Sequence, residues 1–450
     1  MSSIQITKID LIWSYLAKVF SLATGLIVLP FMLNNLTAEE LGLNYLMYTV
    51  SSLVFLLDFG FVYQFGRNFT YVYSGAQRLL KEGTELSHEN SEINYKLLST
   101  LLKTVRYVYA ILSVVCFILM ITLGTIYIYH STDGFTLVKY SLPIWIVFSI
   151  SVYFNIYFCY YNSLLTGSGK IKEYNIATIL SKLIYLIIAF ILLYQGCGLF
   201  SIVIANFISP FVQRWYSHVC FYTPDLKSKL IKDIKYSEVK ELFLIIWYNS
   251  KKLGIHCLGN YAIGNANTFL IGLFLPLHVV ASFGLMKQLI STILNIAQIP
   301  YITYQPQLAA YKISNLNSNL KKLTLQTMGA YWILMLGCCI LFILLAPFVL
   351  NLIDSKTELP NYSIMIIYII AMLLEGNHNN CTTLITIFNK VPYVKANLIT
   401  GLIIILLMVI SLNFTNYGLF GVVFIHFICQ LVYNNWKWPL YAYNELKNLK

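Results

Sequence analysis

The chain contains very few charged residues for its length. Only 11% of its 450 residues are Asp, Glu, Lys or Arg, whereas soluble domains contain about 25%. Hydrophobic residues make up 58% of the chain and the mean hydropathy is +0.70. Apolar runs of about 20 residues, long enough to cross a bilayer, recur along the whole length. The longest polar segments, near 75–100 and 222–241, are too short to bury a core. These features exclude a soluble protein and predict an integral membrane protein.

Motifs of catalysis and metal binding are also missing. The sequence contains no HExxH, no GxSxG and no exposed pair of carboxylates. Its nine cysteines lie mostly in apolar runs, without a CxxC pair or a Cys/His cluster, which predicts buried thiols rather than disulfides or a zinc site. Gly167–Lys170 is not a phosphate-binding loop, because Ile171 stands where that motif needs Ser or Thr. We therefore predict no enzyme activity, no catalytic residue, no cofactor and no metal.

The apolar runs predict an all-α fold with twelve membrane-spanning helices. The expected spans are 9–34, 40–65, 98–128, 140–166, 173–195, 198–219, 243–273, 277–303, 324–352, 361–388, 394–413 and 417–439. If the N-terminus is cytoplasmic, the cytoplasmic segments hold 23 of the 30 Lys and Arg residues, and the outer loops hold only Lys139 and Lys356. This bias agrees with the positive-inside rule and predicts that both termini are cytoplasmic. Nucleic-acid binding is not needed to explain the net charge of +12.

The second half of the chain repeats the first. A shift of 220 residues places Gly198-Leu199-Phe200 on Gly418-Leu419-Phe420, and a shift of 222 aligns the segments 98–121 and 320–343. Duplicated hydrophobic halves are typical of transporters whose substrate site lies between two repeats. The expected domains are a six-helix lobe over 1–222, a cytoplasmic linker over 223–241 and a second six-helix lobe over 242–450. Two amphipathic stretches, 75–97 and 307–322, are expected to form interfacial helices.

Apart from the charges counted with the cytoplasmic segments and those at the helix ends, seven charged residues remain inside the predicted spans. They are Lys18, Lys182, Lys251, Lys252 and Lys287, with Asp58 and Glu375. A charge at the bilayer centre costs about 2.5–3.5 kcal/mol on insertion scales, so such groups usually face a partner or an aqueous cavity. Lysines about two turns from a helix end can instead extend to the interface.

Helical spacing places several of these charges on polar faces of their helices. Lys18 shares such a face with Ser14 and Ser21, and Lys287 shares one with Ser291, Asn295 and Gln298. The seventh helix carries Lys252 with His256, Asn260 and Asn267, and the second carries Asn44 with Asp58. If these polar faces meet, they line one central cavity.

Such a cavity would be cationic on balance and would suit an anionic ligand. We therefore expect Lys18, Lys251, Lys252 and Lys287 to bind an anionic headgroup. Asp58 either carries a coupling ion or stabilises the cytoplasmic end of its helix, and Glu375 is either a proton carrier or the partner of a lysine. His256 is either a packing residue or part of a proton relay.

Several short motifs resemble a known family. They are Glu40-Leu41-Gly42, Leu57-Asp58-Phe59-Gly60 with Arg67, the run Asn162–Lys170, and Pro306-Gln307-Leu308-Ala309. Together they resemble the polysaccharide and O-antigen flippases of the multidrug/oligosaccharidyl-lipid/polysaccharide (MOP) exporter superfamily. The resemblance covers essentially the whole chain and implies two pseudo-symmetric six-helix bundles.

The resemblance also implies a function. Such a flippase moves a polyprenyl-diphosphate-linked oligosaccharide across the bacterial inner membrane by alternating access, coupled to an ion gradient. It implies a monomer that works in the bilayer, with other polysaccharide-assembly membrane proteins as possible partners. Two alternatives stay open. A multidrug cation antiporter of the same superfamily should have an acidic pocket, and a membrane-embedded polysaccharide polymerase or ligase should have a large outer loop with clustered arginines.

Overall fold

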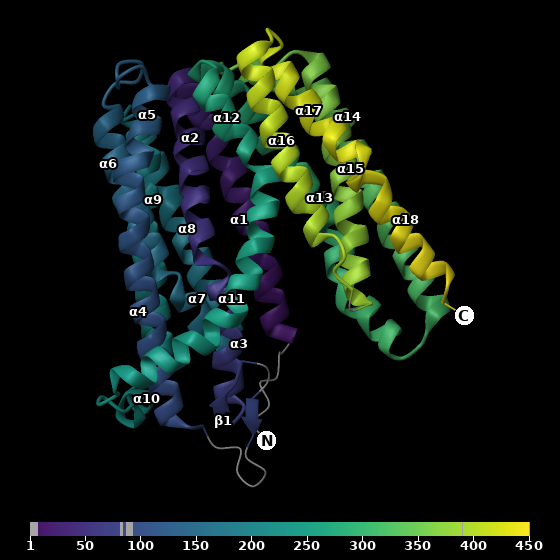
Figure 1. Ribbon diagram of the computed structural model, residues 1–450. Coiled ribbons are helices and arrows are strands. Elements are labelled where there is room, and N and C mark those ends of the chain that lie inside the picture. The colour runs from purple at the N-terminus through teal and green to yellow at the C-terminus, as the bar shows by residue number, and fades with distance from the viewer. Residues whose placement is uncertain (1–7, 82–83, 87–92, 389, 450) are drawn as a thin grey trace. The chain divides into compact units, whose positions relative to one another are not determined.

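The protein is almost entirely helical. The computed structural model describes residues 8–81, 84–86, 93–388 and 390–449 (Figure 1). It forms two compact units, one made of Met1–Leu36 with Val50–Cys257 and the other of Thr37–Thr49 with Leu258–Lys450. The helical segments form two six-helix bundles, which confirms the predicted all-α membrane fold. The predicted domain boundaries at 222 and 242 stay a prediction.

The N-terminal half contains the first six spans, several of which are interrupted. They comprise α1 (Lys8–Asn35); α2 (Ala38–Phe55) with η1 (Leu56–Asp58) and α3 (Phe61–Tyr73); α4 (Tyr95–Leu119) with η2 (Met120–Gly124) and α5 (Thr125–Ser131); α6 (Ser141–Phe158) with α7 (Tyr160–Gly167); α8 (Ile171–Tyr194); and α9 (Leu199–Phe221). A short helix, α10 (Pro224–Lys229), follows the sixth span.

The C-terminal half contains the other six spans. They comprise α11 (Tyr236–Gly264) with α12 (Ala266–Phe274); α13 (Leu277–Ile313); α14 (Asn317–Leu352); α15 (Tyr362–Ile387); α16 (Val394–Phe414); and α17 (Gly418–Val432) with α18 (Asn434–Lys447). The repeat seen in the sequence reappears in these boundaries. Helix α4 starts at 95 and α14 at 317, 222 residues later, and Gly198 and Gly418 both adopt positive φ, 56° and 50°, at the start of a helix.

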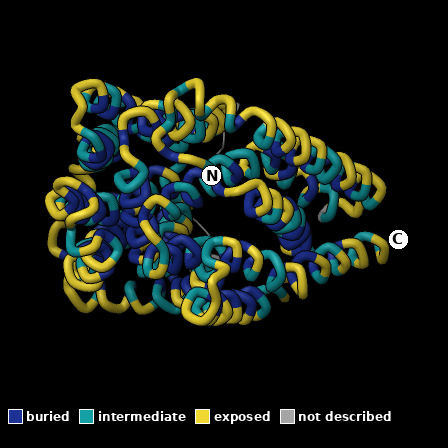
Figure 2. Tube along the Cα trace, turned by 90° about the horizontal axis from the view of Figure 1, so that it is seen from above, coloured by how far each residue is buried: buried dark blue, intermediate teal, exposed yellow. Residues whose placement is uncertain are grey.

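The helices are apolar even where they are exposed. Nine of the described helical segments are long and apolar enough to cross a membrane. The most apolar segment is Asn317–Leu352, whose most apolar 18-residue stretch has a mean hydropathy of 2.9. Only 22% of that stretch is buried inside the protein. Figure 2 shows buried residues toward the inside of each bundle and exposed residues on its outside. An exposed surface of this kind is stable against lipid rather than water.

Three spanning segments are not among those nine, namely α9, α11 with α12, and α15. Two of these three segments carry the buried polar groups described in the next subsection. The polar site therefore lies in part on helices that a criterion of apolarity alone does not select, and in part on α13, α17 and α18, which it does select.

In the described residues, neither of the stretches 75–97 and 307–322 forms a separate interfacial helix. Ala76–Leu79 (β1) and Thr84–Leu86 (β2) instead pair as an antiparallel hairpin. Gly75, with φ of 92°, lies in the turn between α3 and β1. In the second half, α13 continues to Ile313 and α14 begins at Asn317, so the amphipathic stretch consists of the ends of two long helices. A short amphipathic segment does not by itself distinguish a helix from a strand.

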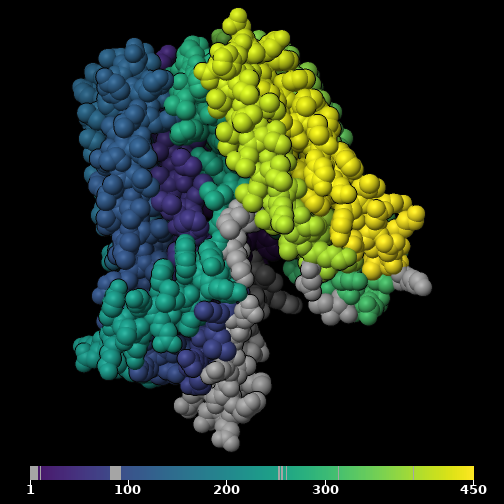
Figure 3. Space-filling view, in the orientation of Figure 1, coloured from purple at the N-terminus to yellow at the C-terminus, as the bar shows by residue number. Residues whose placement is uncertain are grey.

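The segment that joins the two halves is attached to the start of α4. Lys103 Nζ donates to the carbonyl oxygen of Ile234 at 2.8 Å, and the Ile231 amide donates to Ser99 Oγ at 3.0 Å. Lys96 forms an ion pair with Glu238 at 2.8 Å. Figure 3 shows this teal segment at the lower end of the blue helices of the N-terminal unit. These polar contacts hold residues 231–238 against α4.

Close packing of α3 against α7 gives a testable prediction. A Cβ atom on Gly167 would lie 2.5 Å from both the carbonyl oxygen of Gly66 and Cβ of Phe69. We expect Gly167→Ala to lower the free energy of unfolding by about 1–3 kcal/mol, because backbone atoms must move. Gly329→Ala on α14 is the matched control, since a Cβ atom at that position would have no neighbour within 4 Å. Thermal unfolding in detergent should separate the two variants, and equal melting temperatures would contradict the prediction.

Candidate functional site

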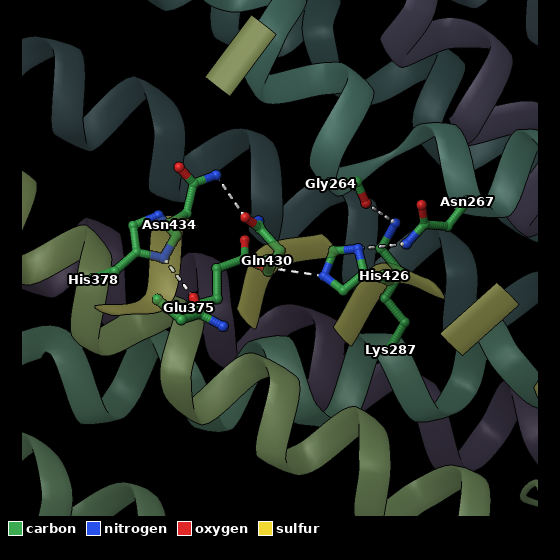
Figure 4. Close-up of polar contacts among 9 residues, drawn as sticks. Gly264, Asn267, Lys287, Glu375, His378, His426, Gln430 and Asn434 are labelled. Carbon is green, nitrogen blue, oxygen red and sulfur yellow. Dashed lines mark hydrogen bonds and ion pairs between the residues drawn. The ribbon is translucent and has the colours of Figure 1, made fainter. Parts of the chain in front are cut away.

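A buried polar network in the C-terminal unit is the main candidate site (Figure 4). It gathers side chains from α12, α13, α15, α17 and α18, together with the carbonyl group that ends α11. A membrane interior offers no water to polar groups, so each of them needs a partner within the protein. The network therefore shows where this bundle concentrates its polar chemistry.

Lys287 of α13 reaches the break between α11 and α12. Its Nζ donates to the carbonyl oxygen of Gly264 at 2.8 Å, to Asn265 Oδ1 at 3.1 Å and to Thr268 Oγ1 at 3.1 Å. An ammonium group has three donors, and all three are used. The C-terminal end of a helix also carries partial negative charge, which attracts the lysine. The three acceptors are neutral, so they solvate the positive charge without cancelling it.

Glu375 of α15 is bonded to a histidine of α17. His426 Nε2 lies 3.2 Å from Glu375 Oε2, and the two side chains are 2% and 16% exposed. Asn267 Nδ2 lies 3.3 Å from His426 Nδ1 on the other side of the ring. An amide nitrogen only donates, so Nδ1 accepts this bond and the ring proton is on Nε2, which donates to the carboxylate. Glu375, for which the sequence left a proton carrier or a lysine partner open, thus has a histidine as its hydrogen-bonded partner.

This arrangement can hold one more proton. In the described part of the chain, the buried Asn267 Oδ1 has no hydrogen-bond partner. A half-turn of the Asn267 amide would place this oxygen toward His426 Nδ1, where it would accept a bond from a protonated ring. Both ring nitrogens would then donate, one to Asn267 and one to Glu375. The trio can therefore take up or release a proton without losing a hydrogen bond.

The network continues toward α18. His378 Nδ1 lies 3.1 Å from Asn435 Oδ1, and Asn434 Nδ2 donates to Gln430 Oε1 at 2.8 Å. Trp438 Nε1 donates to Asn434 Oδ1 at 3.0 Å. These bonds join α15 to α18 and hold Gln430 of α17 to α18.

Asp58 lies at a helix break in the N-terminal unit. The chain between α2 and α3 turns through Phe59 and Gly60, whose φ angles are 46° and 72°. Tyr109 Oη donates to Asp58 Oδ1 at 2.6 Å, and the Val62 amide lies 3.4 Å from Oδ2. A carboxylate near the N-terminus of α3 is favoured by the helix dipole. Arg67, nine residues further on, donates to Gln64 Oε1 at 2.7 Å.

The other predicted residues of the N-terminal unit lie on α1 and α11. Lys18 is exposed and Ser21 half-buried, whereas Ser14 Oγ accepts a hydrogen bond from Asn175 Nδ2 of α8 at 2.8 Å. Lys251 is exposed, with its ammonium 5.6 Å from the centre of the Tyr248 ring.

The remaining predicted residues belong mainly to α2 and α13. Asn44 is buried, Ser291 and Gln298 are half-buried, and Asn295 is exposed. Three predicted side chains lie outside the described part of the structure, and they are Lys252, His256 and Asn260. That all the predicted residues line one central cavity stays a prediction.

Sequence reasoning did not select several members of the C-terminal network. His426 lies within the apolar run Gly418–Val432, and Thr268 and Asn265 lie in the seventh span without a charged neighbour in sequence. A histidine that interrupts an apolar span is the signal that could have identified His426. The partner of Glu375 could not be identified from spacing, because the two residues are on different helices.

Comparisons with known proteins support the fold. No family model matches the chain, and no curated protein matches it by sequence. An inward-facing MATE family multidrug resistance transporter of the MOP superfamily is similar in structure, with a TM-score of 0.63 and 12% identity over 96% of this chain and 95% of its own. The MATE multidrug transporter DinF-BH has a TM-score of 0.61 and 15% identity, over 100% and 98% of the two chains. The lipid II flippase MurJ, in an inward closed conformation, has a TM-score of 0.58 and 13% identity, over 98% and 88%.

These likenesses define the class of fold. The chain has twelve spanning segments in two bundles, and its fold is similar to that of the MATE transporters and of the lipid II flippase MurJ.

Proposed function

We propose that this protein is a flippase that moves a polyprenyl-diphosphate-linked oligosaccharide across a bacterial inner membrane by alternating access of its two lobes. The glycan would be an O-antigen, capsule or similar repeat unit, and both termini would be cytoplasmic. The observation that carries this proposal is the charge balance of the spans. Both intramembrane carboxylates are bonded to neighbouring donors, Asp58 to Tyr109 and Glu375 to His426.

The lysines of the spans are differently placed. Lys18 and Lys251 are exposed, and the ammonium of Lys287 is held by neutral oxygens. Hydrogen bonds to neutral groups cancel neither the lysine nor the carboxylate charges, and the described lysines of the spans outnumber their two carboxylates. The described spans therefore keep a surplus of positive charge. At an effective dielectric constant near 20, two unit charges 4 Å apart attract by about 4 kcal/mol, so such a surplus favours an anionic headgroup such as a diphosphate.

Ion coupling would be the role of the Glu375–His426–Asn267 trio. It can exchange one proton while its hydrogen bonds are kept, which a coupled carrier requires in each transport cycle. The lipid chain would remain in the bilayer while the glycan crosses, and the protein would work as a monomer beside other polysaccharide-assembly proteins.

A second candidate function is export of cationic drugs. The structural similarity to MATE multidrug transporters favours it, as does the 16% exposure that the Glu375 side chain retains. A cationic compound would need a carboxylate that is free to pair with it. The charge balance described above makes this the weaker of the two candidates.

Leaflet transfer in proteoliposomes tests the proposal. We expect the wild-type protein to transfer a labelled polyprenyl-diphosphate oligosaccharide, and Lys18→Gln and Lys251→Gln to slow transfer about five-fold each, since each removes roughly 1 kcal/mol of attraction. Lys139→Gln, in a predicted outer loop, is the matched control and should leave the rate unchanged. Export of a cationic dye without transfer of any diphosphate-linked glycan would overturn the flippase assignment.

A further inference from the structure

A small polar pocket in the N-terminal unit has no role in the site described above. It lies where α3, the residues after β1, and α11 meet (Figure 1). Its volume is about 170 Å³, and its polar lining consists of Arg67, Asn68, Tyr71, Lys81 and Asn249. Pockets for drug-sized ligands usually measure about 300–1,000 Å³, so this one suits a single small group. The positive-inside pattern predicts that it lies on the cytoplasmic side.

Positive charge is concentrated around this pocket. Arg67 and Lys81 line it, and no Asp or Glu is among the described lining residues. Lys81 and Lys251 both approach the same ring, with their ammonium groups 5.8 Å and 5.6 Å from the centre of Tyr248. Two cations therefore line the pocket itself, and the third, Lys251, shares an aromatic ring with one of them. An anion in the pocket would be attracted by this positive charge.

A carboxylate of α11 on the N-terminal side of this pocket is already paired. Glu241 of α11 forms an ion pair with Arg78 at 3.5 Å. Arg67 uses one guanidinium nitrogen on Gln64 at 2.7 Å, and its ring contact with Tyr71, at 5.9 Å, holds the guanidinium over the aromatic face. A guanidinium group has five donors in a fork that matches phosphate oxygens, so Arg67 keeps capacity for an anion.

The pocket is held together by hydrogen bonds rather than by loose side chains. Asn249 Nδ2 donates to the carbonyl oxygen of Lys81 at 2.8 Å, which attaches the segment after β1 to α11. Asn68 is only 6% exposed, and its Nδ2 donates to the carbonyl oxygen of Gln64 at 2.7 Å. The backbone positions of the two cations are therefore set before any ligand arrives.

We propose that this Arg67–Lys81 pocket binds the phosphate groups of a lipid headgroup, and that it is the place where the diphosphate of the transported lipid is first captured on the cytoplasmic side. The second part rests on the proposed flippase function. Phosphate recognition by an arginine fork and a lysine point charge needs no contact with the sugars. The pocket would thus recognise the common diphosphate and leave the choice of glycan to other residues.

Binding to the full-length protein in uncharged nanodiscs tests this proposal. The probes are polyprenyl diphosphate, polyprenyl monophosphate and the corresponding alcohol. We expect Arg67→Gln and Lys81→Gln each to weaken binding of the diphosphate about ten-fold, because each removes one charge-assisted contact. Arg78→Gln is the matched control, a cation of the same segment that is already paired with Glu241, and it should change binding less than about two-fold. Thermal unfolding confirms that the variants are folded.

The possible outcomes distinguish the sources of the phosphate. The proposal is overturned if wild-type and Arg67→Gln protein bind the diphosphate with equal affinity. It is also overturned if the wild-type protein binds the diphosphate and the alcohol with equal affinity. The same binding experiment is repeated in nanodiscs that contain phosphatidylglycerol. If wild-type and Arg67→Gln protein then bind the diphosphate equally well, the pocket is a site for bulk phospholipid, and its role in capturing the transported lipid is overturned. Wild-type leaflet transfer, measured separately, reports on the flippase function, so either proposal can fail while the other stands.

Discussion

Lys287→Met is expected to destabilise the C-terminal bundle and to abolish leaflet transfer. The substitution keeps most of the side-chain volume but leaves three acceptors without their donor, on Gly264, Asn265 and Thr268. An unsatisfied buried polar group costs about 1–3 kcal/mol, and some of this cost is relieved by local movement. We therefore expect the free energy of unfolding to fall by about 2–5 kcal/mol, as measured by thermal and chemical unfolding in detergent.

Two further variants separate stability from charge at this position. Thr268→Val removes one acceptor at nearly constant volume and should cost about 1 kcal/mol while transfer continues. Lys182→Met on α8 is the matched control, since that ammonium lies 5.9 Å from the Tyr185 ring and a cation–π contact is worth about 0.5–1 kcal/mol. A Lys287→Met protein as stable as the Lys182→Met protein would show that the α11–α12 break does not depend on the lysine.

Glu375→Gln is expected to uncouple transport from the ion gradient. The amide can still accept a hydrogen bond from His426 Nε2, so the packing of α15 against α17 should persist, but the side chain can no longer hold a charge. Gradient-driven accumulation should fall at least about ten-fold, while exchange down a concentration gradient remains, because only the step that needs the carboxylate is lost. Paired assays in proteoliposomes with and without an imposed pH gradient measure this difference.

The same pair can be tested by a double-mutant cycle. Glu375→Gln and His426→Gln should show a coupling energy of about 1–3 kcal/mol in unfolding experiments, since the two side chains contact each other. His378→Gln is the matched control, a histidine of the same helix that is bonded to Asn435 instead. Additive effects of Glu375→Gln and His426→Gln, or gradient-driven transport that survives in Glu375→Gln, would remove the trio from any coupling role.

Much of the fold could be predicted because a bilayer imposes simple requirements on sequence. Spans need about 20 apolar residues, and the structure places helices in all twelve predicted regions. The internal repeat could also be recognised in the sequence. Gly198 and Gly418 stand at the start of equivalent helices in the two halves. The hairpin of β1 and β2 was missed because a short polar segment contains no apolar run that decides between helix and strand.

Within the candidate site, the sequence by itself determined which residues are costly in a membrane. Lys287, Glu375 and Asp58 stand out as charges within apolar spans, and their positions alone indicate that each needs a partner. Only the tertiary structure decided who those partners are. Lys287 shares a helix face with Ser291 and Asn295, yet its ammonium is bound to the broken end of another helix.

Helix packing accounts for this division. Spacing along one helix predicts which side chains share a face, but contacts between helices depend on how the helices pack and where one of them breaks. Glu375 meets His426 across a sequence separation of 51 residues, and Asp58 meets Tyr109 across the same separation. The sequence therefore determines which charged residues lie within the spans. The packing of the helices determines which partner each of them contacts.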